Sequence, residues 1–363
     1  MIKYVRKDVT TVGEYTDELY LQNRQRRRRR RRMLYRLRQR VIELTVLAVL
    51  VSAVAIPISL VRRNRDETPV TDPAVSDVDT APTEKPRVVY PTATADTVEL
   101  GATVDAEYAV LVDVTEGRIV AQKRANTRVY PASVTKVMSL LVAVENATDM
   151  NATYEMSYTF LDTLYWAGAT VAGYSSGEKA VVKDMLYGCI LPSGADATIG
   201  LANLLAGSET TFADWMNAKA AELGLKDTHF TNSSGLHDDN HYTTALDMAV
   251  TLAAAMQDPT CREVLSTYQY TTTSTPQHPE GLLLTSTLFS RMYGDEPEGA
   301  TVIAGKTGYT TQAGHTMASY AKGDDGHDYI FVTMDGSSKW EATYDVIDTL
   351  TAFCGPDTTE TVQ

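Results

Sequence analysis

Residues 130–146 read YPASVTKVMSLLVAVEN, in which the part from Ser133 to Asn146 predicts a helix whose first turn carries a serine and a lysine. Ser133 and Lys136 stand three residues apart, so the hydroxyl and the amine can meet across one helical turn. A serine becomes a nucleophile when a neighbouring base takes its proton, and a desolvated lysine with a lowered pKa is such a base. The ordinary alternative is a helix-capping serine next to a solvated lysine. The apolar residues of the stretch recur at helical spacing, which predicts one buried face: Val134, Val137, Met138, Leu141 and Val144.

Two more short motifs follow this helix. Ser193-Gly194-Ala195 precedes a predicted helix, and a second hydroxyl there can relay a proton to a leaving amine. Its ordinary explanation is an N-cap serine. Lys306-Thr307-Gly308 lies at the end of a predicted strand, where an ammonium and a hydroxyl can hold a carboxylate and the glycine leaves room for a substrate. A strand end followed by a turn would also explain this motif.

The order of the three motifs makes chance a poor explanation for them. They follow one another about 60 and 110 residues apart, each in a helix or strand context that suits it. The same set, in the same order, is typical of penicillin-binding proteins and class A β-lactamases. The combination therefore predicts acyl transfer through a serine.

The hydrophobic pattern around the motifs predicts an α+β fold, an antiparallel sheet flanked by helices with a mainly helical subdomain. Strands are expected at both ends of the folded body, and the first two form a hairpin. They are Tyr108–Val114, Arg118–Lys123, Thr301–Gly305, His315–Lys322 and Tyr329–Met334. Helices are expected between them, with one more to close the chain. They are Val182–Ile190, Ala195–Leu205, Thr211–Leu223, Thr244–Met256 and Glu341–Phe353.

Charge is distributed unevenly along the chain. Residues 1–65 carry 17 Lys and Arg against 5 Asp and Glu, whereas the whole chain carries 33 and 46. The remainder therefore has 16 basic and 41 acidic residues, a net charge of −25. Because such a body repels phosphates, the sequence argues against nucleic acid as its main partner.

An uncharged stretch, LTVLAVLVSAVAIPISLV at 44–61, follows the arginine run Arg26–Arg32. Eighteen helical residues span roughly 27 Å, close to the ~30 Å hydrocarbon core of a bilayer. The positive charge before the stretch predicts a single-pass membrane anchor, with residues 1–43 cytoplasmic and the rest exported. Attraction to anionic lipid explains the arginines more simply than a nucleic-acid or nuclear-localisation tract. Ala53-Val54-Ala55 resembles a signal-peptidase site, so a cleaved signal sequence is the alternative to an anchor.

The segment 62–103 is rich in Pro, Thr, Asp and Val and predicts an extended linker between the membrane and the body. We expect the catalytic domain at 104–355 and a short tail at 356–363. The three cysteines are odd in number and far apart, which predicts ordinary buried thiols rather than a disulfide framework or a zinc site. His237 and His241 stand four apart but in a Gly/Asn/Asp-rich loop, so no metal site is expected there.

The body from about Ala106 to Phe353 resembles the D-alanyl-D-alanine carboxypeptidases, which are low-molecular-mass penicillin-binding proteins. Three stretches carry the resemblance: FTNSSGLHDDNHYTTA at 230–245, DMLYGCILPSG at 184–194 and GKTGYT at 305–310. The resemblance implies an extracytoplasmic enzyme that removes the terminal D-alanine from peptidoglycan stem peptides ending in D-Ala-D-Ala. It also implies inhibition by β-lactam antibiotics and no metal or organic cofactor.

The resemblance further implies a role for each motif residue. Ser133 would form the acyl-enzyme, with Lys136 as its base and Ser193 assisting proton transfer. Lys306 and Thr307, followed by Gly308 and Tyr309, would bind the terminal carboxylate of the substrate. The backbone amides of Ser133 and Tyr309 would form the oxyanion hole.

Two features depart from the family pattern. The second motif usually ends in asparagine, whereas this chain has Ala195, whose side chain cannot donate a hydrogen bond to a substrate carbonyl or position the lysine. Asp196 is expected to point elsewhere on its helix. Many relatives also have a β-rich domain and an amphipathic anchor after the catalytic domain. In this sequence the residues after Phe353 are too few to form either of them.

Three rival functions are weighed against the carboxypeptidase. A β-lactamase would need a deacylating glutamate in an ExxLN-like segment, and the sequence contains none. A catalytically weak penicillin-binding or peptidoglycan-binding sensor draws its support from Ala195 alone. A purely structural membrane protein would leave the three ordered motifs unexplained.

Overall fold

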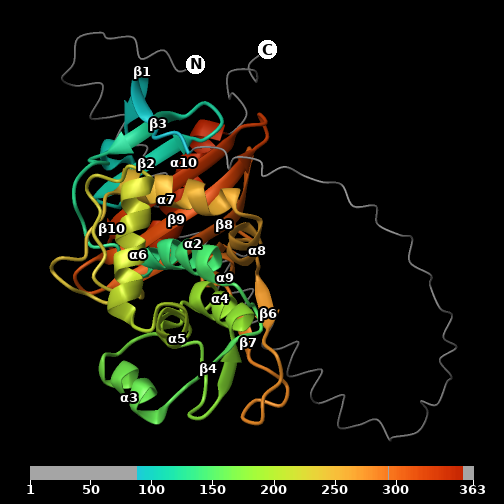
Figure 1. Cartoon of the computed structure of the whole chain (residues 1–363). Coiled ribbons are helices and arrows are strands. Elements are labelled where there is room, and N and C mark those ends of the chain that lie inside the picture. Colours follow the sequence, from blue (N-terminus) through green and yellow to red (C-terminus); the bar gives the residue numbers. More distant parts are fainter. Residues whose placement is uncertain (1–87, 293, 355–363) are drawn as a thin grey trace, which may run out of the picture. The chain divides into compact units, whose positions relative to one another are not determined.

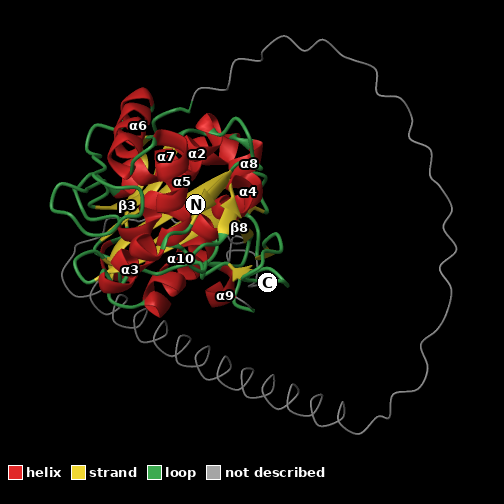
Figure 2. Cartoon of the chain, turned by 60° about the horizontal axis from the view of Figure 1, so that its bottom comes forward, coloured by secondary structure: helices red, strands yellow, loops and turns green. Residues whose placement is uncertain are grey.

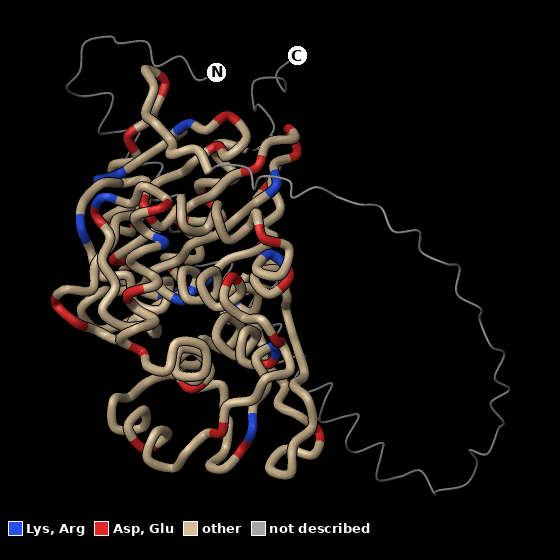
Figure 3. Tube along the Cα trace, in the orientation of Figure 1, with Lys and Arg blue, Asp and Glu red and all other residues tan. Residues whose placement is uncertain are grey.

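The computed structural model describes residues 88–354, apart from residue 293, and all of them belong to a compact unit that begins at Pro86. The predicted cytoplasmic segment, the membrane span at 44–61, the linker up to residue 87 and the tail lie outside the described residues. Among the described helices, none combines the length and the apolar character needed to cross a membrane. Acidic residues outnumber basic ones in this unit, and Figure 3 shows them spread along the trace.

A six-stranded sheet forms the centre of the unit (Figure 1). Its order is β1 (Thr92–Glu99), β3 (Arg118–Lys123), β2 (Tyr108–Asp113), β10 (Asp328–Gly336), β9 (Gly314–Gly323) and β8 (Ala300–Thr310). The pairs are antiparallel except for β1 with β3, which run parallel. The two ends of the domain meet in the middle of the sheet, where Leu111 of β2 lies opposite Phe331 of β10.

Both faces of the sheet are covered by helices, because its central strands are apolar on both sides. Successive side chains of a strand point to opposite faces, so Leu111 and Phe331 join one core and Val110 and Val332 the other. The first core is closed by α10 (Lys339–Cys354) and the second by α2 (Lys136–Asn146) and α7 (Ala245–Gln257). Figure 2 shows the helices gathered around the strands. The predicted α+β architecture is confirmed.

The helical subdomain lies between the first and last strands in the sequence. It contains α3 (Tyr158–Trp166), α4 (Val182–Ile190), α5 (Ala195–Ala206) and α6 (Glu209–Glu222), with the small sheet of β4 (Thr153–Glu155) and β5 (Lys179–Val181). The chain returns to the large sheet through α8 (Pro259–Leu265), the hairpin of β6 (Gln269–Thr271) and β7 (Leu283–Thr285), and α9 (Phe289–Met292). The predicted helices and strands are confirmed, most of them to within about two residues, whereas β8 continues past the predicted end at Gly305 to Thr310.

The predicted linker is wrong over its last part. Residues 92–99 form β1, and the 3-10 helix η1 (Gly101–Thr103) follows, so both belong to the folded unit rather than to a spacer ending at residue 103. Nearly every side chain of β1 is exposed, and no apolar alternation marks it in the sequence. The strand is held by backbone pairing with β3 and by the Thr97 hydroxyl, which donates to the carbonyl of Ile119 at 2.7 Å.

Two motif contexts also differ from the prediction. The helix does not begin at Ser133, because the 3-10 helix η2 (Ala132–Thr135) comes first and α2 begins at Lys136. The lysine–threonine–glycine motif lies inside β8, which continues to Thr310, and not at a strand end. The explanation by a strand end and a turn is therefore excluded.

Candidate active site

Ser133 is the second residue of the 3-10 helix η2, and Lys136 follows the last residue of that helix. In a 3-10 helix, residues three apart lie over one another, which brings the two side chains together. The Lys136 Nζ donates to the Ser133 Oγ at 3.0 Å and to the backbone carbonyl of Ser234 at 2.5 Å. Lys136 is only 2 % exposed. The ordinary alternative, a solvated lysine, is therefore wrong.

The surroundings of Lys136 favour its neutral form. Burial lowers the pKa of the Lys136 amine to about 8, and the negative charges of Asp196 and Glu209 offset part of that effect. Desolvation disfavours an ammonium because the charge loses its water. A lysine with such a pKa is partly unprotonated near neutral pH and can accept a proton from a serine.

Two glycines let neighbouring segments approach the turn of Ser133. A Cβ on Gly308 of β8 would lie 2.8 Å from the Ser133 amide nitrogen and 2.4 Å from the Thr316 Oγ1. Gly235 has a φ of +77°, and a Cβ there would lie 2.0 Å from the carbonyl oxygen of Ala132. The turn is therefore enclosed by β8 and by the segment around Gly235.

Ser193 lies in the connection between α4 and α5 and has a φ of 70°, which is uncommon for a residue other than glycine. Its Oγ is buried and has no hydrogen-bond partner among the described residues. The N-cap of α5 is Gly194, so the ordinary explanation of Ser193 as an N-cap is wrong. A buried hydroxyl without a partner is costly, and it is free to bond a substrate or a transferred proton.

Lys306 and Thr307 lie on β8, which is an edge strand of the sheet. Lys306 is 1 % exposed, and its amine donates to the Thr307 carbonyl at 2.7 Å. Burial, together with the positive charge of Lys136, holds the pKa of Lys306 well below its usual range. The Thr307 Oγ1 lies 2.7 Å from the Thr287 Oγ1. Tyr309 is 56 % exposed beside the motif and stacks on His315, with ring centroids 4.4 Å apart.

Ala195 and Asp196 take no direct part in this arrangement. Ala195 is buried and packs with Leu164 of α3 and Ile199 of α5. The Asp196 carboxylate accepts from the amides of the segment 172–174, at 2.7, 3.0 and 3.3 Å. The prediction that the Asp196 side chain does not take the place of the missing asparagine is confirmed, because its carboxylate bonds these amides. Its role is to hold that segment next to the second motif, where the Ala195 amide also donates to the Thr170 carbonyl at 2.7 Å.

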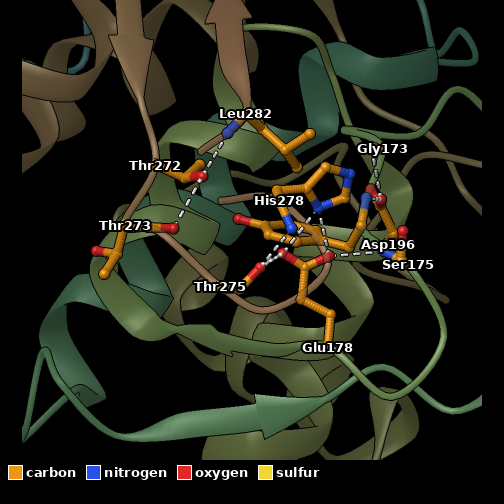
Figure 4. Close-up of polar contacts among 10 residues, drawn as sticks. Gly173, Ser175, Glu178, Asp196, Thr272, Thr273, Thr275, His278 and Leu282 are labelled. Carbon is orange, nitrogen blue, oxygen red and sulfur yellow. Dashed lines mark hydrogen bonds and ion pairs between the residues drawn. The ribbon is translucent and has the colours of Figure 1, made fainter. Parts of the chain in front are cut away.

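A second buried carboxylate holds the other end of this segment (Figure 4). Glu178 accepts from the Ser175 amide at 2.7 Å, from the Thr275 hydroxyl at 2.8 Å and from the His278 Nδ1 at 2.9 Å. Thr275 and His278 belong to the loop of the β6–β7 hairpin, so Glu178 joins two segments that are about 100 residues apart.

His241 contacts the 3-10 helix η2, which carries Ser133, and the sequence did not predict this contact. The side chain is 2 % exposed, and its Nε2 lies 2.8 Å from the Thr135 Oγ1. Because the Thr231 amide donates to Nδ1 at 3.1 Å, the proton of the ring is on Nε2. Burial lowers the pKa of His241 to about 4, so the ring is neutral. The stretch 230–245 signalled the family in the sequence, but nothing in it indicated this contact.

The other histidine of the pair lies apart from this contact. His237 packs edge-on against Tyr130, with ring centroids 4.7 Å apart. Across residues 88–354, leaving out 293, no group of His, Cys, Asp and Glu is arranged to hold a metal ion. All three cysteines are buried, as the sequence indicated.

Residues 92–338 match the family whose description is D-alanyl-D-alanine carboxypeptidase. The chain belongs to this family. It is 33 % identical over 220 residues to D-alanyl-D-alanine carboxypeptidase DacF of Bacillus subtilis, covering 60 % of this chain and 54 % of the relative. With DacA of Escherichia coli the identity is 30 % over 227 residues, covering 60 % and 53 %. The chain thus spans about half the length of these curated relatives.

Solved structures of similar proteins share the fold. The Streptomyces K15 DD-transpeptidase is 27 % identical with a TM-score of 0.60, and the match covers 69 % of this chain and 98 % of that one. A D-alanyl-D-alanine carboxypeptidase from Mycobacterium tuberculosis is 29 % identical with a TM-score of 0.59, covering 70 % and 93 %. The predicted penicillin-binding-protein fold is therefore confirmed.

Proposed function

We propose that this member of the family is a serine D-Ala-D-Ala carboxypeptidase that removes the terminal D-alanine of peptidoglycan stem pentapeptides through an acyl-enzyme on Ser133. The observation that carries the proposal is the 3.0 Å hydrogen bond between Lys136 Nζ and Ser133 Oγ in a buried setting. It supplies a nucleophile and a base already in contact, which is the signature of nucleophilic catalysis.

In the first step the Ser133 oxygen attacks the carbonyl carbon of the penultimate D-alanine while its proton passes to the neutral Lys136 amine. The oxyanion that forms would be bound by the backbone amides of Ser133 and Tyr309. Collapse of the intermediate breaks the peptide bond and expels the amine of the terminal D-alanine. That amine needs a proton, and the unpartnered Ser193 hydroxyl can relay one from Lys136.

Water then completes the cycle. It attacks the ester carbonyl and gives its proton to Lys136, the ester bond breaks, and the Ser133 oxygen takes the proton back. Two products leave, D-alanine and the shortened stem peptide, and every residue returns to its starting protonation state. No cofactor is needed for these steps.

Binding of the peptide would use the free edge of β8. An edge strand has unpaired backbone groups that an extended peptide can join as an additional strand. Lys306 and Thr307 lie on that strand, so we assign them to the terminal carboxylate of the substrate, beside Gly308 and Tyr309. A β-lactam carries a carboxylate and an acylating carbonyl, so it should occupy the same place and acylate Ser133.

For the whole chain we infer attachment to the cell membrane through residues 44–61, with the catalytic domain outside the cytoplasm. The support is the uncharged 18-residue stretch and the arginine-rich segment before it. Fractionation of cells that express the full chain tests this. Release of the chain by carbonate washing, or loss of its first 55 residues, would contradict an uncleaved anchor.

The enzymatic proposal is tested with the full chain in detergent and its Ser133→Ala variant. Each is treated with a fluorescent penicillin and, separately, with diacetyl-Lys-D-Ala-D-Ala. We expect covalent labelling and D-alanine release from the wild type and neither from the variant. Rapid loss of the label would favour a β-lactamase, and a stable label without D-alanine release would favour a sensor. No labelling at all would remove Ser133 as the nucleophile.

A further inference from the structure

Lys136 is held by a backbone carbonyl, although the family pattern assigns its positioning to an asparagine. Position 195 carries alanine here, and its side chain packs against α3 and α5. The amine bonds to the Ser234 carbonyl instead, at 2.5 Å. A carbonyl can fix a lysine only if its own peptide group is fixed, so the contacts of the turn at 232–235 decide where Lys136 points.

Ser233 is the residue through which this turn is attached to its neighbours. Both its amide and its hydroxyl donate to one carboxylate oxygen, Oε1 of Glu209, at 3.0 and 2.7 Å. Its carbonyl accepts from the hydroxyl of Ser139 at 2.5 Å. Ser139 lies one turn beyond Lys136 on α2, so the helix and the turn are joined twice, by Lys136 to Ser234 and by Ser139 to Ser233.

Glu209 is well placed for this task. It is the first residue of α6, where the positive end of the helix dipole stabilises a carboxylate. Hydrogen bonds to a charged acceptor are stronger than neutral ones, and both bonds here converge on one oxygen. The turn is also closed from within, because Asn232 Oδ1 accepts from the Gly235 amide at 2.8 Å. Glu209 is the contact that ties the turn to the helical subdomain.

We propose that Glu209 is the positioning residue for the general base: through Ser233 it fixes the Ser234 carbonyl that holds Lys136 against Ser133. The inference rests on the proposed function, since it concerns the base of that reaction. It assigns to α6 and the 232–235 turn the task that an asparagine of the second motif would perform.

The charge of Glu209 gives the proposal a second readout, in which the other titratable groups around Lys136 are held constant. They are Asp196 on α5, Lys306 on β8, His241, and the thiol of Cys189 on α4, whose pKa is raised by burial. Negative charge at Glu209 raises the pKa of Lys136, against the larger effect of burial. Removing that charge should lower the pKa further and extend activity to lower pH.

Two substitutions separate geometry from charge. Glu209→Gln keeps an oxygen that can accept from Ser233 but removes the charge, whereas Glu209→Ala removes both. Glu222→Gln is the matched control, since Glu222 ends the same helix and pairs with Lys219 at the surface. The full chain and each variant are labelled with a fluorescent penicillin between pH 6 and pH 10, and the acylation rate constant is fitted. Thermal unfolding monitors folding.

In the wild type, the acylation rate constant should rise with pH and then reach a plateau. We expect Glu209→Gln to keep the plateau value within about twofold and to move the rising part of the profile to lower pH. Glu209→Ala should lower the plateau at least about tenfold, and Glu222→Gln should change neither. A pH profile of acylation in Glu209→Ala that matches the wild type in plateau and position would overturn the proposal. So would equal losses in Glu209→Ala and Glu222→Gln, because they would indicate a general effect of the helix.

A second measurement does not depend on catalysis. The pKa of Lys136 is read by NMR in protein with ¹³C-labelled lysine, with Lys136→Arg to assign the signal. A lower pKa of Lys136 in Glu209→Gln than in the wild type supports the proposal. An unchanged pKa would show that Glu209 does not act on Lys136 and would contradict it. If the wild type is not acylated at all, the proposed function fails, and this titration still decides whether Glu209 acts on Lys136. If Glu209→Ala does not fold, Ser139→Ala tests the same turn from α2 and should also lower the plateau.

Discussion

The amine nitrogen of Lys136 lies 3.0 Å from the hydroxyl oxygen of Ser133, and burial lowers the pKa of that amine to about 8. Acylation needs the unprotonated amine. The rate of penicillin acylation should therefore rise with pH through an apparent pKa near 8 and level off above it. Lys136→Arg keeps a positive charge that cannot be removed, so it should slow acylation by roughly 10³ at every pH. Stopped-flow labelling across pH checks both, and a flat profile would contradict Lys136 as the base.

Gly308 is predicted to be irreplaceable because of what lies next to it. A methyl group there would come within 2.4 Å of the Thr316 Oγ1 and 2.8 Å of the Ser133 amide, so β8 would have to move away from the nucleophile. Gly308→Ala should reduce the acylation rate by about 10² or more. The control is Gly326→Ala, which has open space but a φ of +86° and should cost stability of about 1 kcal/mol without affecting acylation. Equal acylation by Gly308→Ala and the wild type would show that the contact does not matter.

Elements that bury a regular apolar pattern could be predicted from the sequence, and β1 could not. In the helix after Ser133 and in the central strands, apolar residues recur at the spacing of a helix or a strand. Residues 92–99 are almost entirely exposed and join the sheet through backbone hydrogen bonds, which leave no mark on composition. The Thr- and Pro-containing stretch therefore read as a continuation of the linker.

The same limit applies to the candidate site. Ser133 and Lys136 were found because one turn of helix brings them together, and Lys306 because its motif is local. Contacts such as Thr135 with His241, or Glu209 with Ser233, join residues that are far apart in the sequence, so no helix or strand periodicity reveals them. The carbonyl of Ser234 could not be predicted at all, since a backbone group has no residue type to mark it.

Ala195→Asn tests whether restoring the family asparagine helps this chain. Ala195 is buried against Leu164 and Ile199, so an amide there would lose its water without a partner in that cluster. We expect a loss of stability of about 1–3 kcal/mol in urea unfolding and no gain in acylation rate. Faster acylation at unchanged stability would mean that the new side chain reaches Lys136 and that position 195 faces the site.

His241 should make the stability of the protein depend on pH. Its pKa is about 4 in the folded state against 6.5 for an ordinary histidine, so the unfolded chain binds the extra proton between these values. The contribution of the neutral His241 to the free energy of unfolding is complete above pH 6.5. It is lost as the pH falls towards 4, by about 3 kcal/mol in total. Urea unfolding from pH 7.5 to 4.5 measures it.

His241→Gln is the matching variant, because its amide can still donate to Thr135 but does not titrate. The difference in unfolding free energy between wild type and variant should shrink by about 1.4 kcal/mol per pH unit below 6.5. Other titrating groups cancel in that difference. Parallel pH dependences of the two proteins would refute the assignment of a neutral, buried His241.

Lys306 should take up a proton when a substrate carboxylate binds. In the free protein, burial and the charge of Lys136 hold the pKa of Lys306 well below its usual range, so this amine gives up its proton more readily than an ordinary lysine. A carboxylate placed beside the amine favours the charged form and raises that pKa again. Calorimetry of diacetyl-Lys-D-Ala-D-Ala binding to the Ser133→Ala variant, in two buffers of different ionisation enthalpy, measures the uptake. Lys306→Gln should abolish it, whereas Thr307→Val should weaken binding and keep it. Binding with no proton uptake would place the carboxylate elsewhere than at Lys306.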